Sequence, residues 1–210
     1  DLRVQAGASK GVLTLQQLDA DLFSGQISNS ARLDAKTAKP VLELNSKVSD
    51  VPLEALVKAL DVQVPVRGLF KLDTALRSSG NSERELVANL GGKGGFSVLD
   101  GQIEGINVDR YLCSAIAVLN RKSISNKIAD KNTAFTAMRG SYTIDKGVLG
   151  NSDLSIAIPG LQNSGKGKLD VNVLGLDYAL GVKLLGDTRE MPDPACAINQ
   201  RYVGLEFPLQ

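Results

Sequence analysis

The stretch Leu176-Asp177-Tyr178-Ala179-Leu180-Gly181-Val182-Lys183-Leu184 decides the fold class, because large apolar side chains recur in it at every second residue. Successive side chains of a β-strand point to opposite faces, so this alternation predicts a strand with one apolar face. The same pattern recurs at residues 2–6, 18–22, 42–48, 70–76, 154–158 and 169–173. Short links with Gly or Asn separate most of these runs, which favours antiparallel hairpins.

Three segments resemble one another and predict repeated hairpins, within residues 10–36, 91–106 and 135–150. Asp100-Gly101 and Lys146-Gly147 both lie between alternating runs, 46 residues apart. Asp-Gly in this position is a strong signal for a two-residue turn, because both central positions favour positive φ. A hairpin that recurs in this way predicts a sheet extended by similar units.

Three helical patterns interrupt the strands, at residues 52–60, 82–90 and about 107–119. Ser82 and Glu85 have the spacing of a capping box at the start of the second helix. The third helix has little polar surface, which predicts that it is covered on more than one side. The expected fold is therefore α+β and β-rich, with a long, twisted, mostly antiparallel sheet or groove and about three short helices on one face.

The composition argues against several classes of function. The chain has no histidine, which removes the commonest general base and metal ligand, so we expect no enzyme, no metal site and no cofactor. Lys and Arg number 24 against 23 Asp and Glu, which gives no basic field for nucleic acid. The longest apolar run, Tyr111 to Leu119, is far shorter than the roughly 20 residues that a membrane-spanning helix needs.

Two glycine-rich segments imitate phosphate-binding loops. Residues 160–167 nearly match the P-loop pattern, but a strand pattern follows them instead of a helix, so we interpret them as a hairpin turn. Residues 91–95 run into the alternating residues 96–99, and we interpret them as a bulge or a tight crossing of two strands. Neither segment predicts a nucleotide site.

From about Lys39 to Leu184 the chain resembles the C-terminal region of the AsmA family, whose relatives include TamB-like envelope proteins. The resemblance depends on the order and spacing of several short pieces, namely residues 51–60, 66–68, 90–96, 99–108, 135–147 and 165–170. It implies a periplasmic module of a protein that an N-terminal helix anchors in the bacterial inner membrane. It implies no catalytic residue. We expect residues 1–210 to be a single fragment of such a protein, with a tail at residues 187–210.

Two functions follow from the resemblance and the aliphatic faces. The first is a hydrophobic β-groove that shelters or transports phospholipid, or another acyl-chain lipid, between the inner and outer membranes. The second is a scaffold that contacts other envelope proteins and supports outer-membrane protein assembly, with its apolar face closed by the helices. The candidate lipid-facing residues are Leu154, Ile156, Ile158, Leu169, Val171, Val173, Leu176, Tyr178, Leu180, Val182 and Leu184.

The two cysteines leave two arrangements open. Cys113 lies on the apolar helix and Cys196 lies in a Pro-flanked segment. The oxidising compartment that the resemblance implies allows a Cys113–Cys196 disulfide. The alternative is a partner for Cys196 beyond Gln210.

Overall fold

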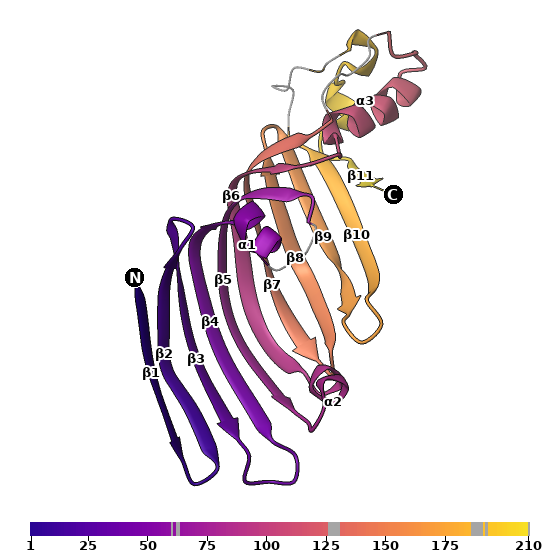
Figure 1. The fold of residues 1–210 in the computed structure, drawn as a ribbon. Helices are drawn as coiled ribbons and strands as arrows, with labels where there is room; N and C mark the ends of the chain where they lie inside the picture. The colour runs from indigo at the N-terminus through magenta and orange to yellow at the C-terminus, as the bar shows by residue number, and fades with distance from the viewer. Residues whose placement is uncertain (60, 62–63, 126–130, 186–190, 192, 210) are drawn as a thin grey trace.

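Eleven antiparallel strands form one sheet, in which every strand pairs with its neighbours in sequence. The computed structural model describes residues 1–59, 61, 64–125, 131–185, 191 and 193–209. The strands are β1 (Leu2–Ser9), β2 (Val12–Leu22), β3 (Gly25–Asp34), β4 (Val41–Pro52), β5 (Val66–Ser79), β6 (Gly91–Ile103), β7 (Thr133–Asp145), β8 (Val148–Ile158), β9 (Leu161–Asp170), β10 (Gly175–Leu184) and β11 (Glu206–Leu209). The predicted β-rich, antiparallel fold is confirmed (Figure 1).

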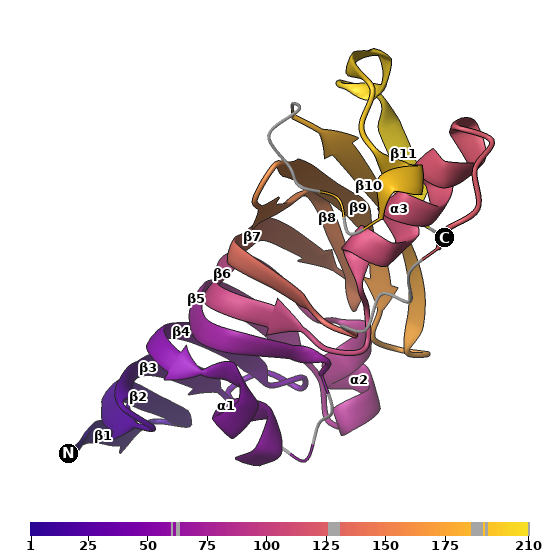
Figure 2. The same ribbon diagram turned by 90° about the horizontal axis from the view of Figure 1, so that it is seen from above.

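The three predicted helices are present, and they occupy connections between consecutive central strands. They are α1 (Leu53–Ala59), α2 (Glu83–Ala88) and α3 (Val108–Leu119). The Ser82 side chain accepts a hydrogen bond from the Glu85 backbone N–H, as the capping spacing predicts. The helices lie at the ends of the strands, α2 at the end opposite to α1 and α3 (Figure 1), and all on the same side of the sheet (Figure 2). Much of that side is therefore left without a helix over it.

The turns between strands agree with the predicted hairpins at two of three places. Lys146 and Gly147 have φ values of 51° and 77°, and they connect β7 to β8. Phe23 and Ser24 adopt the same conformation, with φ values of 50° and 72°, between β2 and β3. Both pairs have the two positive φ angles that a two-residue hairpin turn with the twist of its strands requires.

The predicted turn at Asp100-Gly101 is wrong. Strand β6 continues through both residues to Ile103, and Gly101 pairs with Phe135 of β7. Only Asp100 has a positive φ, 49°, so the chain forms a local irregularity in the ladder and does not reverse. The glycine serves a different purpose, because a Cβ at Gly101 would collide with the Phe135 ring and the Arg67 carbonyl.

We therefore expect Gly101→Val to destabilise the protein by about 2–3 kcal/mol, since the added atoms overpack a site already filled by Phe135. Urea unfolding of the purified variant measures this loss. Gly7→Val in β1 is the matched control, because no atom lies within 4 Å of a Cβ at Gly7. Equal stability of the two variants would show that β6 does not pass close to Phe135.

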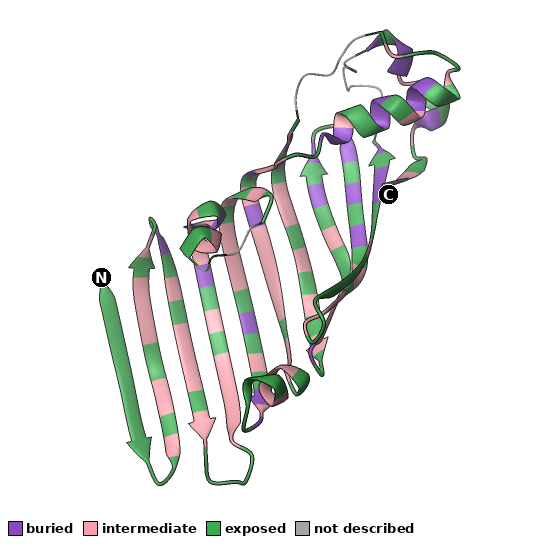
Figure 3. Ribbon diagram, turned by 45° about the vertical axis from the view of Figure 1, so that its right-hand side comes forward, coloured by how far each residue is buried: buried purple, intermediate pink, exposed green. Residues whose placement is uncertain are grey.

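The buried residues concentrate at one end of the sheet (Figure 3), where α3 and the tail lie against the strands. The tail contains two short 3₁₀ helices, η1 (Pro194–Cys196) and η2 (Gln200–Tyr202), before β11 pairs with β10. We call α3, η1 and η2 the cap. At the other edge every residue of β1 is exposed. One end of the molecule is thus a closed core, and the remainder is a sheet with open faces.

Candidate functional site

A continuous row of aliphatic residues and one glycine crosses the sheet on the side that carries the helices. Each member lies directly opposite the next on the neighbouring strand, from β1 to β10. The row consists of Ala6, Leu15, Ala31, Leu44, Leu76, Gly92, Ile144, Leu149, Leu169 and Leu176. Every member is at least partly exposed: Ala6 and Leu176 are exposed, and the other members are half-buried. We call it the aliphatic row.

A second apolar row lies four residues farther along each central strand, towards the cap. Ile27, Val48, Leu72 and Phe96 are successive partners in it, and Gly140 of β7 follows them. The Phe96 ring lies against Gly140, where a Cβ would approach it to 3.1 Å. The glycine therefore lets the ring lie close to the sheet, which keeps the apolar surface shallow. Together the two rows form the groove.

Polar residues separate the two rows. In β3–β5 these residues are Asn29, Ser46 and Thr74, which are paired across the strands. On β7, β8 and β10 the positions are taken by Tyr142, Asn151 and Tyr178, and on β6 and β9 they are glycines, Gly94 and Gly167. The sequence carries a signal for this polar belt that the alternation of apolar residues does not reveal, because Ser46 interrupts the run Leu42, Leu44, Val48.

The hydroxyls of Thr74, Tyr142 and Tyr178 in the belt donate hydrogen bonds to other protein groups. Tyr142 Oη donates to Thr74 Oγ1 at 2.9 Å, and Thr74 Oγ1 donates to the Lys93 carbonyl at 3.2 Å. Tyr178 Oη donates to Asn151 Oδ1, and burial raises the pKa of this phenol above its usual value, with a further contribution from the Asp153 charge. These hydrogen bonds satisfy polar groups inside an apolar surface, where an unpaired hydroxyl would cost free energy.

The structure divides the candidate lipid-facing residues into three groups. Leu154, Leu169, Leu176, Tyr178 and Leu180 are exposed or half-buried on the groove side. Val171 and Val173 lie in the turn after β9.

The third group consists of Ile156, Ile158, Val182 and Leu184, which are at most 8% exposed. They belong to the hydrophobic cluster under the cap, where they contact protein. Sequence alternation alone does not separate this group from the open one.

The cap is fixed to the sheet by several kinds of contact. A disulfide joins Cys113 of α3 to Cys196 of η1, with the Cα atoms 4.8 Å apart. Tyr202 Oη donates to Asn120 Oδ1 at 2.9 Å, and Asn120 Nδ2 donates to the Ala195 carbonyl at 3.0 Å. Ile116 is fully buried between these elements. The tail therefore closes the groove side of the sheet at one end.

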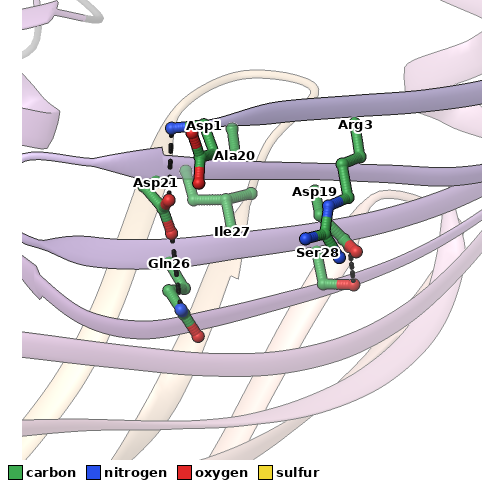
Figure 4. A pocket seen from close by; sticks show the side chains of 8 residues that line it. All are labelled: Asp1, Arg3, Asp19, Ala20, Asp21, Gln26, Ile27 and Ser28. Carbon is green, nitrogen blue, oxygen red and sulfur yellow. Dashed lines mark hydrogen bonds and ion pairs between the residues drawn. The ribbon is translucent and has the colours of Figure 1, made fainter.

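A shallow pocket of about 430 Å³, lined mostly by polar and charged residues, lies near the β1 edge (Figure 4). Ser28 Oγ donates to Asp19 at 2.7 Å, and this bond, with a second from Gln17, lowers the pKa of the Asp19 carboxyl. Gln26 Nε2 donates to Asp21 Oδ1 at 3.3 Å. The two carboxylates thus have protein partners, and among the described residues no group of three or more metal-ligating side chains occurs.

A comparison with protein-family models finds the AsmA family over residues 1–154. The chain belongs to the AsmA family. AsmA family proteins are proteins of the bacterial envelope. This chain is also similar to the protein AsmA of Escherichia coli (strain K12), with 21% identity over 186 residues, 89% of the chain. It spans only 30% of the length of that relative. No solved structure matches it. In this AsmA family member, none of the described helices has the length and apolarity to cross a membrane.

Proposed function

We propose that this AsmA family member is a non-enzymatic periplasmic module that shelters the acyl chains of phospholipid in its groove, within a protein anchored in the inner membrane. The observation that carries the proposal is the aliphatic row, which carries no polar side chain across ten strands and is at least partly exposed at every member. Solvent-exposed apolar surface of this extent is typical of binding sites.

The dimensions of the row suit an acyl chain. Strands lie about 4.8 Å apart, so a row across ten strands is roughly 43 Å long. The hydrocarbon core of a bilayer is about 30 Å thick and contains two layers of acyl chains, so each layer needs about 15 Å. The row is therefore long enough for more than one chain placed end to end. On β10 the row ends at Leu176, which is exposed, whereas the closed core lies at the other end of that strand, at Val182 and Leu184.

Site-specific photo-crosslinking tests the proposal. A photoreactive residue at Leu44, which faces the groove, should crosslink to phosphatidylethanolamine or phosphatidylglycerol during expression or in detergent-free lipid exchange. The matched control is Asn45, the next residue on β4, which is exposed on the opposite face. Native mass spectrometry of the purified chain reports the same lipids as bound mass. Equal crosslinking at both positions, or no lipid at Leu44 beside a lipid carrier that is labelled, would contradict the proposal.

The alternative function, a scaffold for outer-membrane protein assembly, predicts a different arrangement of the helices. It requires the helices to close the apolar face and leave only polar surface. Here α1, α2 and α3 lie at the strand ends (Figure 1), and every residue of the aliphatic row is at least partly exposed. This arrangement supports the lipid proposal over the scaffold.

A further inference from the structure

The turn between β9 and β10 exposes an unusual amount of aliphatic surface. Val173 is 75% exposed, Leu174 is 80% exposed and Leu176, the first large residue of β10, is 71% exposed. No other turn among the described residues brings together three large aliphatic side chains with exposures as high as these. We call these three residues the tip. Isolated exposed apolar residues are normal on protein surfaces, but a cluster of them marks an interaction site.

The backbone conformation of Leu174 is a second, independent indication that the tip has a role outside the stability of the fold. Leu174 has a φ of 54°, in the left-handed region that Gly and Asn adopt readily and Leu does not. Its side chain is almost fully in solvent, so no internal contact compensates for the strain. A leucine that costs stability through both its backbone and its exposure persists where the side chain acts on something outside the fold.

Hydrogen bonds fix the residues at the base of the tip. Asn172 Nδ2 donates to the Lys146 carbonyl at 3.1 Å and to Asp170 Oδ1 at 2.9 Å. The Val171 backbone N–H donates to the Gly147 carbonyl at 2.9 Å. These bonds tie the β9–β10 turn to the neighbouring β7–β8 turn. The Asp170 carboxylate is engaged inside the turn, and the tip itself carries no charge.

The size and position of the tip favour a lipid bilayer as its partner. A stable protein interface buries about 800 Å² on each partner, which is more than three side chains on a narrow turn provide. Insertion into a bilayer needs no shape complementarity, because its strength follows the apolar area buried at the headgroup boundary. Leu176 is also the last member of the aliphatic row on β10, so the tip continues the groove surface beyond the strands.

We propose that Val173, Leu174 and Leu176 insert into the headgroup–acyl boundary of a bilayer and dock this end of the sheet on the membrane. Val173 and Leu174 lie in the turn, outside the strands, so their insertion is tested separately from whether the groove holds lipid. Because no charge lies in the tip, it binds neutral as well as anionic bilayers, and salt does not weaken it.

Vesicle flotation of the full chain tests the docking, with phosphatidylcholine vesicles at low and at high salt. The wild-type protein floats in both. Leu174→Asn and Val173→Ser each reduce the bound fraction by roughly tenfold, the factor expected when most of the burial of one aliphatic side chain is lost. Leu174→Asn also raises the midpoint of thermal unfolding, because Asn tolerates the positive φ. Weaker binding by a protein of higher stability separates this effect from a folding defect.

Val118→Ser is the matched control, because Val118 is also 75% exposed and belongs to α3, which lies far from the β9–β10 turn in Figure 1. It leaves the flotation unchanged. The chain contains no tryptophan, so Leu174→Trp provides a single fluorophore whose emission shifts to the blue on adding vesicles, while Val118→Trp shows no shift. Wild-type protein that stays unbound, tip variants that float fully, or loss of binding with Val118→Ser would each overturn the proposal. Lipid crosslinking at Leu44 is a separate result that these outcomes do not change.

Discussion

Ile116→Asp is expected to lower the free energy of unfolding by about 3–5 kcal/mol, because the new carboxylate enters an apolar cluster with no partner. Ile116 is fully buried in the same cluster as Leu184 and Tyr202. The loss is measured by urea unfolding followed by circular dichroism. Ile116→Asp should also loosen the packing of the cap on the sheet. Protease cleavage within the tail, faster than in the wild type, would reveal this.

Val118→Asp is the control for this prediction, since it places the same charge on the exposed side of the same helix. Its effect is expected to stay within about 0.5 kcal/mol, as for most surface substitutions. Comparable losses for the two variants would mean that α3 is not packed through Ile116. Wild-type stability of Ile116→Asp would mean that the cap does not form in solution.

Removal of the disulfide is the second large change. The double variant Cys113→Ala, Cys196→Ala is expected to lose about 4 kcal/mol of stability in the chain-entropy model, because the bond joins residues 83 positions apart. Urea unfolding measures this loss in two ways. One is the difference in stability between the oxidised and the reduced wild type, and the other is the difference between the oxidised wild type and the double variant. The reduced wild type is the control, since it loses the bond without losing any side-chain atom.

The pairing itself is checked by thiol counting on denatured, unreduced protein. The structure predicts no free thiol, since no described cysteine is unpaired. Two free thiols per chain, in protein prepared under oxidising conditions, would contradict the pairing. Equal stability of the reduced and oxidised forms would instead show that the bond costs the folded state as much free energy as it costs the unfolded chain.

Local signals predicted the strands and helices because alternation and capping act over a few residues. The pairs Asp100-Gly101 and Lys146-Gly147 show where such signals fail. Both have the composition of a hairpin turn, but the chain reverses only at the second pair. At the first, Gly101 is needed because Phe135, which comes 34 residues later, occupies the space of a Cβ. A short window of sequence contains no trace of that contact.

For the candidate site, the local alternation predicted the apolar face but not which part of that face the cap covers. Leu169 and Val182 belong to equally regular alternating runs, yet Leu169 is partly exposed in the groove and Val182 is 1% exposed under the cap. The difference arises from the tail, whose place over the sheet depends on Cys113, Cys196 and Tyr202. Alternation fixes which face is apolar, whereas long-range contacts decide which part of that face is closed.

The strictly consecutive order of the strands gives the molecule a directional stability. Each inner strand pairs only with the strands before and after it, as in a linear array of repeats whose stability is a sum of nearest-neighbour interfaces. One edge of this array is the fully exposed β1, and the other is held by a covalent bond and a buried cluster. Amide hydrogen exchange should therefore become slower, strand by strand, from β1 towards β8. Partial unfolding would begin at the β1 edge and could remove strands one at a time while the capped end stays native.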